Sequence, residues 1–418
     1  MADVRSHAGT APGIEPEVVE ALWAQARELQ APMVDFTRRL IQTPSLPGEE
    51  GDVARLVAEE MATLGYDQIR IDEVGSVIGI IRPTGEHASA PMRRIMLNTH
   101  IDQVDVGDES RWPYPPFEGR IVDGEIWGRG SSDLKGSLAT HVYAGALLKR
   151  TGIPLPNEVY VTGVVQEEVG GLGSFVLAES LPVDYVLIGE PSANRIALGH
   201  RGRLELVVTI TGKSVHASVP DTGINPLYSM SRFLLALEQV TFEPDPNHPA
   251  LGPTTIAPTL FTTDQKSANV LPGECKVVLD VRNTPADTAE VVLSRVQAVL
   301  DEALTDGATA TLTIPPLTLT SYTGVTRTIE VHHPWGLGAE TPLATGTLAV
   351  LRAALKREVP VQMWRFATDA GHFAGLGIPV IGFGPGYEEV IHTVNERISI
   401  ELMVEGMVAA AALAVGLK

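Results

Sequence analysis

The 418-residue sequence contains a single cysteine, Cys275, which excludes a disulfide framework within the chain and any cysteine-rich zinc site. It has no apolar run of the roughly 18 residues that a helix needs to cross a bilayer, and the alanine-rich stretch from Val408 to Leu417 predicts a packed helix instead. Its first residues do not follow the pattern of a signal peptide. We therefore expect a cytoplasmic protein in which any metal is held by His, Asp and Glu.

Basic residues are scarce relative to acidic ones. The chain has 31 Lys and Arg against 51 Asp and Glu, for a formal net charge of −20. This balance argues against a nucleic acid partner and against binding to an anionic membrane surface. A content of 44% hydrophobic and 20% charged residues is typical of a globular protein, and the chain is long enough for two domains.

The order of predicted elements describes an α/β domain interrupted by a smaller α+β domain. Buried strands alternate with helices in the first part of the chain, and this pattern resumes near Thr341. Between them the order is strand, helix, two strands, helix, strand, which is a split βαβ arrangement. We expect a catalytic domain with a mostly parallel central sheet in residues 1–195 and 317–418, and an inserted ferredoxin-like α+β domain in residues 196–316.

Two local patterns make sharper predictions. Pro32 lies inside the helical pattern from Glu15 to Gln42 and predicts a division into two helices. Asp123-Gly124 separates two short strand patterns and predicts a tight hairpin turn.

Acidic residues and a histidine recur at the carboxyl ends of predicted strands and in a glycine-rich loop before a helix. In open α/β sheets, this edge collects ligands and catalytic groups. Two adjacent carboxylates there are not both buried unless a cation or a proton compensates them. The residues concerned are His100, Asp102, Asp133, Glu167, Glu168 and Glu190.

Each of these features alone has an ordinary interpretation. His-x-Asp occurs on surfaces and in cores, and an isolated Glu-Glu pair is usually an acidic loop. The glycines from Gly128 to Gly136 suggest a phosphate loop, but the Gly-Lys-Ser/Thr ending is absent. Recurrence at four successive strand ends favours one common site.

Two histidines and three carboxylates, without cysteine, form the ligand set of a binuclear zinc, cobalt or manganese hydrolase, and the late histidine His392 supplies the second imidazole. One carboxylate must bridge two cations about 3.5–4 Å apart, and Asp133 in its constrained loop fits this position best. His100 and Glu190 would hold one metal. Glu168 and His392 would hold the other.

The remaining two acids are expected to serve the chemistry without binding a metal. Adjacent side chains usually point apart, so Glu167 would stay free beside the attacking water and act as general base. Asp102 lies two residues after His100 in extended chain, so both point the same way and Asp102 would orient the imidazole.

These motifs resemble those of the M20 metallopeptidases, which include acetylornithine deacetylase, succinyl-diaminopimelate desuccinylase, aminoacylase and glutamate carboxypeptidase. The resemblance runs from about residue 20 to the C-terminus. Within the family, three segments are most similar to a branch of hydrolases assigned to selenium metabolism: Trp364–Asp369, Ile381–Gly386 and Arg201-Gly202-Arg203. The family motifs are His100-x-Asp102, Gly128-Arg129-Gly130-x-x-Asp133-x-Lys135-Gly136, Glu167-Glu168, Gly189-Glu190-Pro191 and His392-Thr393-x-Asn395-Glu396.

The resemblance implies a zinc-peptidase-like catalytic domain and a homodimer formed through the inserted domain. It implies that His216 reaches the partner's active site and stabilises the oxyanion there. It also implies that Asn269 and Arg282 bind a carboxylate of the substrate. By the residues alone, these three would be a loop histidine, a turn asparagine and a surface arginine.

The chain departs from the family pattern around the first motif. Thr99 stands where the family usually has Gly, and Gln103-Val104-Asp105 replaces its Val-Val-Pro. These changes keep the ligands, but the family's contacts at the edge of the substrate pocket are not carried over to this chain. Among the histidines that match no motif, His200, His332, His333 and His372 are expected to be structural or exposed.

We expect a hydrolase with two divalent metal ions, zinc first and cobalt or manganese as alternatives, that removes an N-acyl group from a small amino acid. A dipeptidase or carboxypeptidase with the same machinery is the first alternative, with a dipeptide as substrate. A metal-binding protein without turnover is the second, and loss of Glu167 or of a ligand would have favoured it. The net charge hints at a cationic substrate such as an ornithine derivative, although it says little about one pocket.

Overall fold

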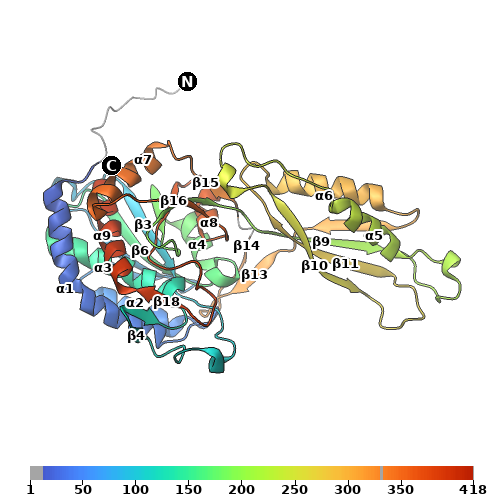
Figure 1. Cartoon of the computed structure of the whole chain (residues 1–418), viewed down its shortest axis with the longest axis horizontal. Helices are drawn as coiled ribbons and strands as arrows, with labels where there is room; N and C mark the ends of the chain where they lie inside the picture. The colour runs from blue at the N-terminus through green and yellow to red at the C-terminus, as the bar shows by residue number, and fades with distance from the viewer. Residues whose placement is uncertain (1–12, 330–332, 418) are drawn as a thin grey trace, which may run out of the picture.

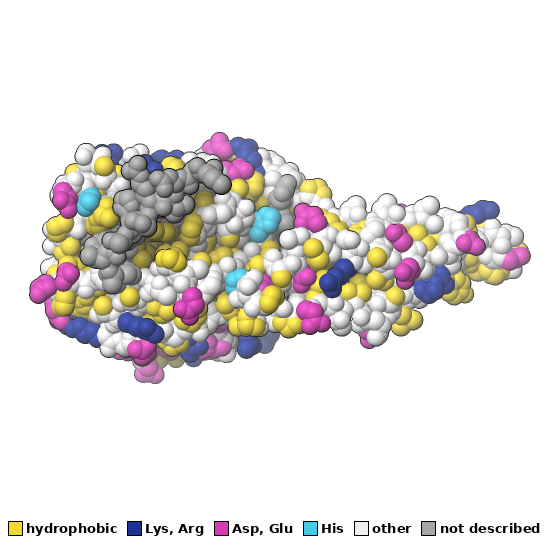
Figure 2. Space-filling view, turned by 90° about the horizontal axis from the view of Figure 1, so that it is seen from above, with side chains coloured by type: hydrophobic (Ala, Val, Ile, Leu, Met, Phe, Trp, Pro, Cys, Tyr) yellow, Lys and Arg dark blue, Asp and Glu magenta, His cyan; other side chains and the backbone are white. Residues whose placement is uncertain are grey.

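The computed structural model describes residues 13–329 and 333–417, which form two lobes of unequal size (Figure 1). Figure 2 shows the smaller lobe projecting from the larger as a narrow extension, with acidic and basic side chains interspersed on the face in view. The helices of the larger lobe are α1 (Pro16–Ile41), α2 (Gly51–Thr63), α3 (Gly136–Thr151), α4 (Leu172–Ser180), α7 (Pro342–Leu355), α8 (Ala370–Gly375) and α9 (Ile400–Gly416).

A mixed sheet of nine strands, counted over the described residues, is the centre of the larger lobe. Its middle strands β6, β3, β7 and β17 are parallel, and antiparallel pairs flank them, which confirms the α/β class. The strands are β1 (Gln68–Ile71), β2 (Val77–Ile81), β3 (Arg94–His100), β6 (Glu158–Val164), β7 (Tyr185–Ile188), β8 (Ile196–His200), β15 (Trp335–Gly336), β16 (Val361–Trp364) and β17 (Val380–Gly382).

Helices cover both faces of this sheet. Because successive side chains of a strand point to opposite faces, Ile95 and Leu97 of β3 join the core under α1, α3 and α9, whereas Met96 joins the core under α4 and α8. Burial on both faces explains why the central strands are apolar almost throughout. It also leaves the strand ends as the place where polar side chains gather.

Helix α1 is continuous, so the expected division at Pro32 is wrong. Pro32 lies on the exposed side, where water can bond the carbonyl group that the proline leaves without a partner. Met33 and Phe36 are buried on the other side. Packing along the whole helix therefore outweighs the local disadvantage of proline, which is about 3 kcal/mol.

The predicted hairpin is confirmed. Strands β4 (Arg120–Val122) and β5 (Glu125–Trp127) pair antiparallel around Asp123 and Gly124, both with positive φ. This is the conformation that a two-residue hairpin turn requires. Strand β18 (Arg397–Ser399) adds to β5, and so brings the segment after His392 against the glycine-rich loop.

The smaller lobe has its own core. Four antiparallel strands in the order β10-β11-β9-β12 carry two helices on one face, as a split βαβ arrangement requires. Cys275 is buried in this core. The elements are β9 (Leu204–Thr211), α5 (Pro226–Leu237), β10 (Thr255–Thr263), β11 (Glu274–Arg282), α6 (Ala289–Ala303) and β12 (Thr309–Thr313).

The sheet pairing places the crossing between the lobes slightly later than residue 196. Strand β8 pairs with β15, β16 and β17 of the larger sheet, so the chain leaves that sheet after His200. On the return, the chain forms a hairpin of β13 (Leu317–Thr320) and β14 (Thr326–Ile329). In the part of the chain described, no helix is long and apolar enough to cross a membrane.

Candidate metal and catalytic site

The last residue of β3, His100, lies between two carboxylates. Its Nε2 atom is 2.9 Å from Oδ1 of Asp133 and 3.8 Å from Oε1 of Glu190, which follows β7. All three side chains are buried. One ligand atom from each lies within 4.8 Å of the others, as a metal ion would require.

A second cluster shares Asp133 with the first. Nε2 of His392 lies 3.1 Å from Oδ2 of Asp133 and 3.1 Å from Oε2 of Glu168. These three residues also offer ligand atoms within 4.8 Å of one another. The two oxygens of Asp133 thus face different histidines, and Asp133 is the member common to both clusters.

The charge balance fits two cations. Burial alone lowers the pKa of His100, but its contacts with Asp102 and Asp133 outweigh burial and raise that pKa well above the usual range. Hydrogen bonds to Asp133 and Glu168 raise the pKa of His392 to about 10. The carboxylates thus demand positive charge at both histidines, and a divalent cation at each position supplies it while the imidazoles stay neutral.

The carboxylates give the same result from their own side. Burial, together with the charge of Asp133, raises the pKa of Glu168 and raises that of Glu190 well above its usual range. Burial and the neighbouring Glu190 do the same to the pKa of Glu167. Without a cation, the three carboxyl groups resist being ionised at the same time. Cations bound among them would allow all three to carry their negative charge.

The turn after β6 is tied to β3 through Asp102. The backbone N–H groups of Glu167 and Glu168 donate to the two oxygens of the fully buried Asp102 carboxylate, at 3.1 Å each. Nδ1 of His100 lies 3.1 Å from the backbone oxygen of Asp102 and 3.4 Å from its carboxylate. Asp102 therefore fixes the position of the His100 ring relative to the turn that carries Glu167 and Glu168.

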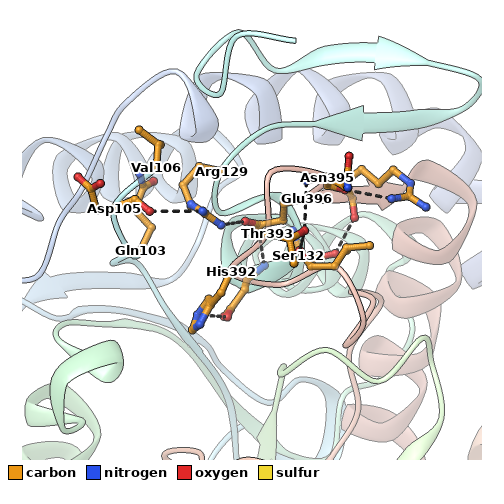
Figure 3. Close-up of polar contacts among 12 residues, drawn as sticks. Gln103, Asp105, Val106, Arg129, Ser132, His392, Thr393, Asn395 and Glu396 are labelled. Carbon is orange, nitrogen blue, oxygen red and sulfur yellow. Dashed lines mark hydrogen bonds and ion pairs between the residues drawn. The ribbon is translucent and has the colours of Figure 1, made fainter. Parts of the chain in front are cut away.

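The loop that carries Asp133 is held from behind by a buried ion pair (Figure 3). Oε1 of Glu396 accepts the backbone N–H groups of Ser132 and Asp133 at 3.1 Å each. Its Oε2 lies 2.5 Å from Nη1 of Arg129, whose Nη2 donates to the carbonyl of Asp105 at 3.3 Å. Glu396 and Arg129 are both buried, and the guanidinium lies 5.0 Å from the Trp112 ring centre.

Burial changes the ionisation of this support. It raises the pKa of Glu396 to about 7, against the opposing effect of Arg129. Burial lowers the pKa of Lys135 to about 7, and this ammonium group donates to Thr43 and Gln103. The sequence motifs contain all three charged residues, but sequence reasoning assigned them no role. The available signal was a charged residue inside a motif: Arg129 and Lys135 in the glycine-rich motif, and Glu396 in the motif that begins at His392.

A cavity of about 210 Å³ opens onto the two clusters. Its lining combines the acids of the larger lobe with two arginines of the smaller lobe, Arg203 and Arg282. Sequence reasoning expected Arg282 near the substrate, but named Arg203 only as part of a resemblance. The apolar part of the rim includes Phe366 and Ile391.

His216 and Asn269 lie together but away from this cavity. Both are exposed on the smaller lobe, where the Ala217 N–H donates to the Asn269 carbonyl. The imidazole of His216 contacts only Ser218 among the hydrogen bonds formed by the described residues, at 2.7 Å. Of the histidines outside the motifs, His200 and His372 are buried, His333 is exposed and His332 lies outside the described residues.

Comparison with known proteins agrees with this geometry. Residues 96–415 match the model of peptidase family M20/M25/M40, so the chain belongs to this family and is a metal-dependent hydrolase. It is 31% identical over 379 residues to the uncharacterized protein YgeY of Escherichia coli (strain K12), covering 89% of this chain and 91% of that one.

Two further proteins place the chain among named relatives. Succinyl-diaminopimelate desuccinylase of Paracoccus denitrificans is 28% identical over 292 residues, which cover 66% of this chain and 75% of the relative. The fold is shared with the YXEP protein of Bacillus subtilis, a dinuclear metal binding peptidase of family M20. That match has a TM-score of 0.67 and 16% identity, and covers 93% of this chain and 98% of the other.

Proposed function

We propose that this protein is a binuclear metal amidohydrolase that removes an N-acyl group from a small amino acid. The observation that carries the proposal is the bridging position of Asp133 between His100 and His392, with Glu167 beside it on the cavity wall. The similarity to a desuccinylase favours a deacylase. A dipeptidase or carboxypeptidase remains the second candidate, because the YXEP protein with the same fold is described as a peptidase.

The chain's own residues would perform the proton transfers. His100 and Glu190 would hold one divalent cation, Glu168 and His392 the other, and Asp133 would bridge them. When bound, the cations supply Lewis acidity that polarises the scissile carbonyl and acidifies water. We infer zinc for both positions from the mixed nitrogen and oxygen ligands, with cobalt and manganese as alternatives.

Glu167 is the proposed general base. It belongs to neither of the two clusters of potential ligands, and it lines the cavity next to Glu168, so its carboxylate is free to accept a proton there. It would take a proton from the attacking water and return it to the leaving amine. His216 of a second copy would stabilise the oxyanion, and Asn269 and Arg282 would bind the substrate's carboxylate. This scheme requires a homodimer. We infer separately, from composition and charge, a cytoplasmic protein without nucleic acid or membrane as partners.

The test is hydrolysis of a substrate panel by the zinc- or cobalt-loaded protein and by Glu167→Gln. The panel contains N-acetylornithine, N-succinyl-diaminopimelate, other N-acyl amino acids and dipeptides. We expect turnover of N-acyl compounds, with kcat lower by about 10²- to 10⁴-fold in the variant. Two metals per chain should remain bound in the variant. Cleavage of dipeptides alone would refute the deacylase proposal and support the dipeptidase or carboxypeptidase.

A further inference from the structure

Two arginines of the smaller lobe form one wall of the catalytic cavity. Arg203 precedes β9, Arg282 ends β11, and both line the cavity together with Asp133, Glu168 and Glu190 from the larger lobe. A molecule in this cavity therefore has the metal-binding acids on one side and two guanidinium groups on the other.

Strand register places the two arginines next to each other. Leu204 pairs with Val281 in the antiparallel ladder of β9 and β11, so Arg203 and Arg282 are the next opposed positions. Leu204 and Val281 point into the core under the helices, and alternation turns the arginines to the opposite face. Opposed residues of such a ladder have Cβ atoms about 4.5–5.5 Å apart.

One carboxylate serves both guanidinium groups. Asp280 is bonded by Nε of Arg282 at 2.7 Å, by its Nη2 at 3.3 Å and by Nε of Arg203 at 3.3 Å. Within the described residues, both terminal nitrogens of Arg203 and Nη1 of Arg282 make no hydrogen bond. Glu205 is opposed to Asp280 on the same face, but within the described residues it forms no ion pair with either arginine. The free guanidinium nitrogens can therefore bind an anion in the cavity.

We propose that Arg203 and Arg282 together bind the two carboxylates of an acidic amino acid, so that the substrates are N-acyl derivatives of the glutamate or aspartate type. This inference rests on the proposed deacylase function. The family resemblance implies a carboxylate at Arg282, while Arg203 adds a second anion-binding position. Paired arginines suit this task because each guanidinium offers two parallel donors to a carboxylate.

The groups that line the cavity bear on its substrate more directly than the acidic composition of the whole chain does. Charges more than about 8–10 Å away are largely screened at physiological ionic strength, whereas groups in contact within a partly enclosed cavity are not. A cationic ornithine side chain would meet Arg203 directly. The net charge of −20 therefore does not predict a cationic substrate for this cavity.

The experiment compares N-acetyl-L-glutamate with its neutral isostere N-acetyl-L-glutamine. In the metal-loaded protein we expect kcat/KM for the glutamate compound to be higher by about 10-fold or more. Arg203→Gln should lower it by about 10- to 100-fold, the range of a lost charge-assisted hydrogen bond, and lower kcat/KM for the glutamine compound by clearly less. Arg203→Lys should recover part of the loss.

Arg201→Gln is the matched control, because it removes the same charge two residues away. Arg201 contacts Pro253 and Thr255 and does not line the cavity. It should alter neither substrate. Equal rates on both compounds in the unmodified protein, or an equal loss on both in Arg203→Gln, would overturn the proposal.

A binding measurement separates this inference from the proposed deacylase function. If no N-acyl compound is hydrolysed, the deacylase proposal fails, and calorimetry with glutarate and butyrate then tests the arginine wall alone. Tighter binding of glutarate than of butyrate, abolished in Arg203→Gln, would support the wall. Equal glutarate affinity in the unmodified protein and in the variant would refute it.

Discussion

The two lobes contribute to the active site in different ways. In the larger lobe, His100, Asp133 and Glu190 are buried, and further hydrogen bonds fix the His100 ring and the Asp133 backbone. In the smaller lobe, His216 and Asn269 are exposed and contact only their own surroundings. The residues proposed to bind metal are therefore already together within one chain, whereas His216 and Asn269, which we propose to contact the substrate, do not line the cavity of this chain.

Asp133→Asn, in the larger lobe, should produce the largest effect. Asp133 is the member common to both clusters, so its loss should weaken both metal positions at once. We expect the affinity for both ions to fall by more than the roughly 10- to 100-fold typical of a residue outside the ligand set. Metal analysis after dialysis is the measurement. Retention of two tightly held ions would show that Asp133 is not a bridge.

Glu396→Gln should rank next, because it leaves Arg129 buried without its carboxylate. Removing one member of a buried pair lowers the free energy of unfolding by about 3–5 kcal/mol. We also expect weaker metal binding, since the N–H groups of Ser132 and Asp133 lose their charged acceptor.

The neighbouring pair of Glu125 and Arg397 provides a control for Glu396→Gln. These side chains are 25% and 30% exposed and lie 2.9 Å apart. Glu125→Gln should change stability by about 0–1 kcal/mol and leave metal affinity alone. Similar losses in both variants would mean that the support behind Asp133 is an ordinary surface contact.

His216→Ala tests the part of the site that we propose a second copy completes. We expect kcat to fall by about 10²- to 10³-fold, as for the loss of an oxyanion donor, with metal content unchanged. Mixing this variant with Glu167→Gln should restore activity, because a mixed dimer contains one site with both residues intact. Failure of the mixture to regain activity would indicate that His216 does not act across a dimer.

The smallest expected effect concerns acid stability of the larger lobe. Burial lowers the pKa of His200 to about 4 from its usual 6.5, so the unfolded chain binds an extra proton between these values. Stability should therefore fall as pH falls, by about 2 kcal/mol between pH 7.5 and pH 5. Denaturant unfolding at both pH values measures this loss, and His200→Gln should reduce it. An unchanged pH dependence in that variant would exclude His200 as its source.

The sequence determined the class of the fold and identified the residues that meet in the two clusters. Apolar runs buried on both sides predict a parallel centre, and acids at the ends of such runs converge because parallel strands share one edge. His100, Glu168 and Glu190 could be selected in this way, Asp133 by its glycine-rich loop, and His392 as the late histidine that completes the ligand set. These are local patterns, and a one-dimensional sequence records them directly.

Tertiary structure decided what depends on packing between distant segments. Helix α1 continues through Pro32 because its buried face outweighs a local preference. The contact between Arg129 and Glu396 joins residues 267 positions apart, and Arg203 reaches the cavity only because β9 pairs with β11 in one register. No local pattern specifies such pairings, since they follow from how two lobes and their sheets fit together.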